Sequence, residues 1–277
     1  MSIVAISETA GSLGNEIGRR LAERLGYRFA DREIIAKAAE RFGEDVSDLR
    51  HAAEERPTLW ERWTDTQRRY KAYIEAIILE MATGDDVVLA GLAATIVLRP
   101  VPHALRVRTN APERVRAGRV EQQQGLTRAA ALDHLRQSDH ERAARVKFLY
   151  QVQVDDPLLY DVVLNTERVM ADEGARLVQE ALHEPRFQTS AASQRDLVDL
   201  GIAAGAKAAF MASPVIGPHR VFVSASGGYV CLSGVVDTED ERKLAHEIVA
   251  KMPGVTGVLN DIIAVPRGRS GGPLMMH

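Results

Sequence analysis

Short apolar runs alternate along this chain with longer segments in which apolar residues recur every three or four positions. The runs occupy residues 3–6, 87–90, 104–107 and 162–164. Continuous apolar runs of this length are typical of strands buried on both faces of a parallel sheet. Between them, residues such as Ile17, Leu21 and Leu25 have helical spacing, and Gly26 stands where a helix would end. The pattern predicts an α/β fold with a parallel sheet flanked by helices.

One long helix is predicted over residues 59–81, where apolar residues follow the helical period. Trp60 and Trp63 lie in it, and two roles are open to them. They could stack on a nucleotide base, or they could pack in the core. The helical spacing of the apolar positions favours packing.

The pattern changes after Leu182. Residues 184–195 are polar and rich in small side chains, which predicts a linker between domain 1–183 and a second domain, 196–266. The second domain has a helix, strand, strand, helix, strand pattern. The tail 267–277 is predicted to be disordered.

Composition narrows the function classes. The chain has 277 residues, a formal net charge of −3 and a pI near 6.3, so no global positive field would attract nucleic acid, and any anion site must be local. Cys231 is the single cysteine, so an intrachain disulfide and a cysteine-based zinc site are excluded, and its apolar strand predicts a buried position. His134 and His140 are six residues apart, a poor zinc spacing, and we expect no metal site of the protein's own.

The N-terminus lacks the features of a signal peptide. The longest apolar run, residues 87–98, lies between Asp86 and Arg99 and is too short to span a bilayer. We therefore expect a cytoplasmic protein with no transmembrane segment.

The segment 7–18 joins the first predicted strand to the first predicted helix. Backbone N–H groups and the helix dipole converge at such a junction and can bind phosphate. The segment is not a G-x-x-x-x-G-K-[ST] loop, because Thr9 stands in place of the first glycine and Asn15 in place of the lysine. By itself it could equally be an ordinary strand-to-helix turn that contains glycine.

The segments that follow residues 7–18 show that this part of the chain resembles a known family. Together with residues 19–35, segment 7–18 resembles the opening of the cytidylate kinase-like family. Later segments are similar, in order, to that family's second strand and glycine turn, third strand, lid and closing strand; they are residues 88–91, 106–119, 139–147 and 156–166. The likeness covers about residues 1–182 and implies a P-loop nucleoside monophosphate kinase fold.

The resemblance also implies a chemistry: transfer of phosphate from ATP, with Mg²⁺, to a nucleoside monophosphate such as CMP. This reaction needs positive charge near the phosphates and exclusion of water, and the planar fork of arginine suits phosphate oxygens. Arg119 and Arg142, with Arg145, would face phosphates when the lid closes. Asp139 would contact the acceptor sugar or orient an arginine, and Asp31 would lie in the acceptor pocket. The implied nucleotide-binding residues of the loops are Gly11, Ser12, Leu13, Gly14, Asn15, Glu16 and Gly91.

An alternative interpretation of these arginines is a solvated helix surface with ion pairs such as Asp139/Arg142 and Glu141/Arg145. Two departures from the family pattern bear on activity. Asn15 replaces a cation of the loop, and Leu92 stands where the family commonly has an arginine. Loss of a cation at a dry phosphate site slows transfer by powers of ten. The sequence thus leaves two hypotheses open, an active kinase and a catalytically inactive pseudo-kinase with a regulatory role.

The last seventy residues carry a second resemblance. The pattern Gly-x-Val-x-Leu-x-Gly at 228–234 precedes a helix predicted to begin at Thr238 with Glu241 three residues on, and Gly254-Val255 precedes the last strand. This series resembles a BON domain, a small α+β unit. Its glycines and valines identify a fold and leave the ligand open, so a small ligand or a protein partner is implied. A third hypothesis is that function lies wholly in this domain.

Overall fold

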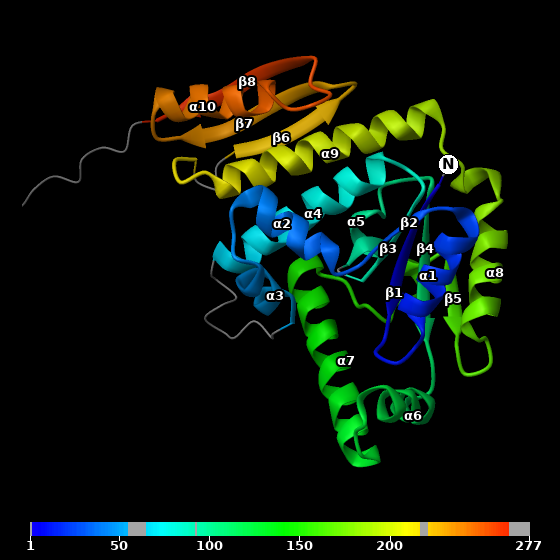
Figure 1. Ribbon diagram of the computed structural model, residues 1–277. Helices are drawn as coiled ribbons and strands as arrows, with labels where there is room; N and C mark the ends of the chain where they lie inside the picture. Colours follow the sequence, from blue (N-terminus) through cyan, green and yellow to red (C-terminus); the bar gives the residue numbers. More distant parts are fainter. Residues whose placement is uncertain (1, 55–64, 92, 217–220, 266–277) are drawn as a thin grey trace, which may run out of the picture.

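The computed structural model describes residues 2–54, 65–91, 93–216 and 221–265. Its larger sheet has five strands in the order β2-β3-β1-β4-β5, all parallel (Figure 1). The strands are β1 (Ile3–Glu8), β2 (Arg28–Ala30), β3 (Val87–Ala90), β4 (Ala104–Asn110) and β5 (Val162–Asn165). The predicted parallel sheet flanked by helices is confirmed.

Helices cover both faces of this sheet. On one face lie α1 (Gly14–Leu25) and α8 (Ala171–Leu182), and on the other α2 (Glu33–Phe42), α4 (Asp65–Thr83) and α5 (Ala94–Val97). Helix α3 (Val46–Glu54) packs beside α2 and α4. In β1, Ile3 and Ala5 enter one core while Val4 and Ile6 enter the other. A strand buried on both faces needs apolar side chains at every position, which explains the continuous run.

Two helices extend from the carboxyl edge of the sheet, the edge toward which all five strands point. They are α6 (Glu113–Gln124) and α7 (Arg128–Tyr150), which pack against each other (Figure 1). Thr127 caps α7, because its hydroxyl accepts a hydrogen bond from the Ala130 amide. A short 3₁₀ helix, η2 (Pro157–Leu159), then leads into β5. In open parallel sheets, ligands bind beyond the carboxyl ends of the strands, so α6 and α7 border the expected site.

The C-terminal unit has the predicted order of elements. It consists of α9 (Ala191–Ala212), β6 (Val221–Ser226), β7 (Tyr229–Val236), α10 (Glu239–Ala250) and β8 (Gly257–Ala264). Strands β6 and β7 are antiparallel, and β7 and β8 are parallel. The cap predicted at Thr238 is present, with its hydroxyl accepting from the Glu241 amide at 3.1 Å.

The structure differs from the linker expected at 184–195. The 3₁₀ helix η3 (Pro185–Phe187) occupies part of this stretch, and α9 begins at Ala191 with a capping box between Ser190 and Ser193. The small polar residues therefore begin a helix instead of forming an extended connection. Helix α9 lies between the two sheets (Figure 1). It supplies side chains to the core on the α4 face of the large sheet and to the C-terminal core; the first set is Leu197, Ala208 and Met211, and the second is Ile202, Ala206 and Phe210.

The long helix expected over 59–81 is present from Asp65, whereas Trp60, Trp63, Leu92 and the tail 267–277 lie outside the described residues. Cys231, expected to be buried, is only half-buried, because it points to the face of β7 opposite the C-terminal core. Among the described residues, every helix is too short or too polar to cross a membrane.

Candidate active site

The loop between β1 and α1 contains two residues with left-handed backbone. Gly11 has φ +74° and Leu13 has φ +62°. Gly11 also packs closely against α6, since a Cβ there would lie 2.9 Å from the carbonyl oxygen of Arg116. Leu13 occupies the N-cap position of α1 and has no polar atom with which to cap it. The first amides of α1 are therefore available to another acceptor.

That acceptor is Glu8, the last residue of β1. Its Oε2 accepts from the backbone amide of Asn15 at 3.1 Å, and its Oε1 accepts from Asn15 Nδ2 at 2.9 Å. Gly14 makes room for it, because a Cβ at Gly14 would lie 2.7 Å from Glu8 Oε2. Asn15, which stands in place of a loop lysine, thus donates to an acid. Glu8 was not predicted as a site residue, although an acidic residue between a buried strand and a helix start is the signal that would have found it.

Two other predicted loop residues have local partners. The Ser12 hydroxyl is fully buried and lies within hydrogen-bonding distance of Thr9 O, Thr109 O and Thr109 Oγ1. Glu16 forms an ion pair with Arg20 at 2.6 Å. Ser12 therefore fixes the loop to β4, and the Glu16 carboxylate is engaged along α1.

Arg119 of α6 binds the loop from outside. Its Nη1 donates to Gly11 O at 3.0 Å and to Thr166 Oγ1 at 3.0 Å, and its Nη2 donates to Thr166 O at 2.5 Å. Burial lowers the pKa of this guanidinium, and the nearby charge of Glu16 opposes that shift. Arg119 was expected to face phosphates; in the structure it joins the loop to the residue that follows β5.

Arg116, which the sequence analysis did not assign a role, makes a similar contact. Its Nη1 donates to Ala10 O at 3.3 Å and forms an ion pair with Asp139 of α7 at 2.8 Å. Asp139 was expected to contact an acceptor sugar or to orient an arginine, and its contact in the structure is with an arginine. The α6–α7 pair is thereby attached to the loop.

Arg142 reaches the loop from α7, with Nη1 donating to the Glu8 carbonyl oxygen. Burial lowers the pKa of Arg142, the charge of Glu8 opposes this, and the cations Arg108 and Arg145 lower it further. The structure thus brings Arg108, Arg142 and Arg145 together near the end of β1, with the acids Glu8 and Asp139 also near Arg142. Three positive charges gathered in a partly buried place favour an anionic ligand.

Arg108, the third cation, was quoted only as part of a strand in the sequence analysis. It lies on β4 with its side chain almost fully buried, donating to Ser7 Oγ at 2.8 Å and to Asp155 Oδ1 at 3.1 Å. An arginine beside the apolar residues of a buried strand was the available signal, because buried arginines need partners.

A cavity of about 130 Å³ lies beside this cluster. Its lining includes two of the α7 arginines, two tyrosines and the glycine after β3, namely Arg142, Arg145, Tyr70, Tyr150 and Gly91. Burial raises the pKa of Tyr70 to about 12, so its hydroxyl stays protonated. Ligand pockets are usually about 300 Å³ or larger, so this space holds a phosphate-sized group and must widen to admit a nucleotide.

Two predicted residues lie elsewhere. Asp31 follows β2 and pairs with Arg19 at 3.2 Å, and neither it nor Arg119 is among the described residues that line the 130 Å³ cavity. Among the described residues, no three or more His, Cys, Asp or Glu side chains are grouped in a way that could hold a metal ion.

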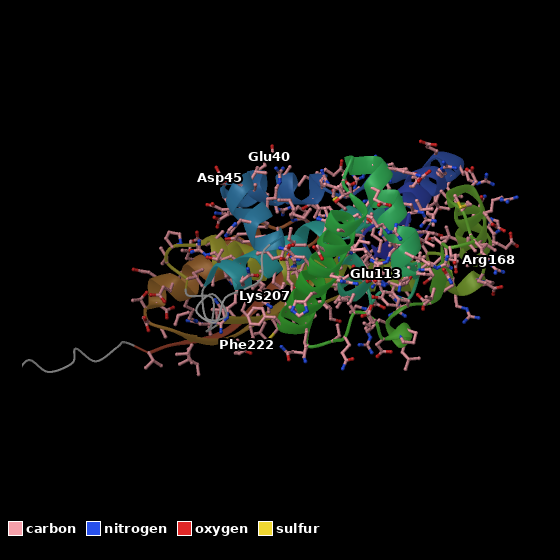
Figure 2. The ribbon with its side chains drawn as sticks, turned by 90° about the horizontal axis from the view of Figure 1, so that it is seen from below. Glu40, Asp45, Glu113, Arg168, Lys207 and Phe222 are labelled. Atoms are coloured by element: carbon pink, nitrogen blue, oxygen red, sulfur yellow. The ribbon has the colours of Figure 1, made fainter. Side chains whose placement is uncertain are left out.

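A second cavity, of about 750 Å³, lies between α4, α5, α9 and β6. Lys71 and Glu75 of α4, Lys207 of α9 and Phe222 of β6 line it, and Figure 2 labels the last two. Tyr150, at the end of α7, lines this cavity and the smaller one. Ile96 of α5 also lines both, so two side chains border both the cavity at the arginine cluster and the space between the two units.

Comparison with known proteins agrees with this geometry. The model of the cytidylate kinase-like family matches residues 3–168, and the model of the BON domain matches residues 199–266. Cytidylate kinase of Methanopyrus kandleri is 29% identical over 189 residues, covering 65% of this chain and 92% of that protein. Cytidylate kinase of Natronomonas pharaonis is 29% identical over 181 residues, covering 65% and 88%.

The fold has a counterpart among solved structures. An uncharacterized protein from Eubacterium ventriosum aligns with 65% of this chain and 97% of its own, with a TM-score of 0.53 and 18% identity. The family match spans the β1–α1 loop, the arginines of α6 and α7, and all five strands of the parallel sheet. The chain therefore belongs to the cytidylate kinase-like family and carries a BON domain after its kinase-like region.

Proposed function

We propose that this protein binds a nucleotide at the β1–α1 loop and transfers phosphate from ATP to a nucleoside monophosphate of the cytidylate type. The observation that carries the proposal is the grouping of Arg108, Arg142 and Arg145 beside a phosphate-sized cavity at the carboxyl edge of the sheet, with Arg142 donating to Glu8 before the loop. The curated relatives named cytidylate kinase support the acceptor class.

The residues have distinct roles in this proposal. Amides of the loop, from Gly11 to Glu16, bind phosphate oxygens, and Arg142 and Arg145 neutralise the charge that moves during transfer. Asp139 orients Arg116, while Asp31 borders the acceptor pocket after α7 has moved. Mg²⁺ takes few ligands from protein in such sites and most from phosphates and water, so the bound ATP supplies most of its shell. We place this activity in the cytoplasm, with no nucleic-acid partner.

A second candidate function is a nucleotide-sensing regulator without catalysis. The contact of Glu8 with Asn15 favours it, because Asn15 stands where a kinase would have a cation and both its amide and its side chain are engaged by an acid. Restoring basic residues with Asn15→Arg and Leu92→Arg separates the two candidates. Kinase activity that appears only in the double variant supports a decayed kinase. Activity that is present in the unaltered chain and lost in the double variant supports an unusual site that works.

The BON domain is proposed to couple the kinase-like region to a small ligand or a protein partner. Helix α9 belongs to the cores of both units, and the 750 Å³ cavity is lined by both. A ligand there would contact Tyr150, which also borders the arginine cluster. Calorimetry on the full chain with candidate ions and small molecules would test the coupling.

The direct test is an assay of ADP release with ATP, Mg²⁺ and each common nucleoside monophosphate. We expect turnover that is highest with CMP and that falls by about a hundredfold or more in Arg142→Met, the size of effect seen when one charge-stabilising group is removed. Arg136→Met is the matched control, since Arg136 lies on the same helix and pairs with Glu113 on the surface. Absence of turnover with every acceptor would eliminate the enzymatic proposal.

A further inference from the structure

The carboxylate of Glu8 lies where a ligand phosphate would bind. A phosphate at the start of a helix uses the amides of the first turn, and Asn15 is the second residue of α1. The Asn15 amide donates to Glu8 Oε2 at 3.1 Å, and the Asn15 side chain donates to Oε1 at 2.9 Å. Both oxygens of one carboxylate are thus engaged by one residue at the helix start.

The surroundings also suit an anion in this position. Gly14 has no side chain, and the space beside it is filled by Glu8, whose Cβ would be 2.5 Å from a Cβ at Gly14. The guanidinium of Arg142 donates to the Glu8 carbonyl oxygen and interacts electrostatically with the Glu8 carboxylate. The Glu8 carboxylate therefore has a helix N-terminus, an amide side chain and a cation around it, which is the set of groups that binds phosphate.

We propose that Glu8 is an intramolecular occupant of the phosphate loop, so that a ligand phosphate binds there only by displacing its carboxylate. The inference rests on the proposed function, because it concerns the same loop. It makes Glu8 a residue that selects among anions. A polyphosphate with several negative charges gains enough from the arginine cluster to displace one carboxylate, whereas an anion of low charge does not.

Glu8→Gln tests this, because the substitution keeps the shape and removes the charge. Binding of ATP and of inorganic pyrophosphate to the full chain is measured by calorimetry, with inorganic sulfate as the weakly charged comparison. We expect affinity for ATP and pyrophosphate to rise about tenfold or more in Glu8→Gln, as for removal of a charged competitor. Sulfate binding should become detectable only in this variant. Glu8→Ala should change the affinity in the same direction, and Glu23→Gln, at an exposed acid of α1, should leave it unchanged.

The outcomes separate this inference from the proposed function. If the unaltered protein binds ATP and Glu8→Gln binds it no more tightly, then Glu8 does not occupy the phosphate position, while the proposed nucleotide site stands. If only Glu8→Gln binds ATP, the proposed role of Glu8 is supported and the unaltered chain is not a working kinase. If neither binds ATP or pyrophosphate, both are rejected.

A second measurement does not depend on a ligand. Hydrogen exchange of the Asn15 amide should be faster in Glu8→Gln than in the unaltered protein, by about tenfold, because a charged acceptor has been lost. Equal exchange rates in the two proteins would show that the carboxylate does not hold this amide in solution, and would overturn the inference.

Discussion

The two sheets of this protein use their surfaces differently. The five-stranded sheet is covered on both faces, and its polar chemistry lies in loops at one edge. The three-stranded sheet has α9 and α10 on one face, while Phe222, Tyr229 and Ile263 on the other face are more than half exposed. A sheet buried on both faces can bind ligands only at the ends of its strands. A sheet covered on one face has a second face on which a ligand or partner can bind. The difference favours catalysis in the first region and binding in the second.

The largest expected effect comes from substitutions in α9, the helix that the two regions share. Ala208 is fully buried in the core of the large sheet, and Ala206, two residues earlier, is fully buried in the C-terminal core. An aspartate at either position would be an unpaired buried charge, with an expected loss of about 3 kcal/mol or more. Because both cores share α9, each variant should lower a single thermal transition of the whole chain.

Differential scanning calorimetry checks this prediction, with the exposed Ala192→Asp as the control on the same helix. Two separate transitions, of which each variant shifts only one, would show that the two regions unfold independently.

The turn between β6 and β7 gives a matched pair of glycines. Gly227 and Gly228 both have positive φ. A Cβ at Gly228 would lie 2.6 Å from Gly254 O, whereas a Cβ at Gly227 would have no atom from elsewhere in the described chain within 4 Å. Gly228→Ala should cost about 2 kcal/mol or more, and Gly227→Ala only about 1 kcal/mol from backbone strain. Urea denaturation curves of the two variants measure this, and equal losses would rule out the close approach to Gly254.

Substitution of Arg119 should destabilise the β1–α1 loop of the large sheet. Arg119→Met removes three hydrogen bonds to Gly11 and Thr166, and we expect a loss of about 1–2 kcal/mol together with weaker nucleotide binding. Arg114→Met is the control, because Arg114 is an exposed partner of Glu167 and should change stability by less than about 0.5 kcal/mol. Chemical denaturation and ATP titration measure the two effects. An unchanged ATP affinity would mean that Arg119 does not order the loop for its ligand.

The smallest expected effect concerns pH. His103 is buried, which lowers the pKa of its imidazole, although the charge of Asp85 opposes the shift. The unfolded chain then binds a proton near pH 6.5 that the folded chain does not, so stability is full above that pH and falls as the pH drops below it. His103→Leu should reduce the fall in melting temperature between pH 7 and pH 5, and the exposed His246→Gln should not. An equal fall in His103→Leu and the unaltered protein would show that His103 does not titrate on unfolding.

Much of the fold could be predicted from the sequence, because burial on both faces produces apolar runs that are easy to identify. Four strands of the large sheet, the strands of the small sheet and the cap at Thr238 follow from local pattern, whereas the three-residue strand β2 was not predicted. The role of α9 could not be predicted, since its polar first turn looks like a linker until the capping box of Ser190 and Ser193 is seen. A helix that serves two cores also has little amphipathic contrast, because both of its faces are apolar.

The candidate site was predicted less completely. The loop residues, Arg142 and Arg145 were selected through the resemblance, from their order along the chain. Arg108 and Arg116 were missed, because their roles depend on partners far away in the sequence: Arg116 meets Asp139, and Arg108 meets Asp155. Spacing along one helix or strand does not reveal such pairs, which form only when the sheet brings its carboxyl ends together. Glu8 was missed although its partner Asn15 is only seven residues away.

The central claim is that the β1–α1 loop binds a polyphosphate. The most direct measurement is the amide NMR spectrum of the unaltered protein with saturating ATP, together with its melting temperature. The account predicts shifts confined to residues 7–18 and the adjoining part of α7, with a raised melting temperature. An unchanged spectrum over residues 7–18 and an unchanged melting temperature would contradict it.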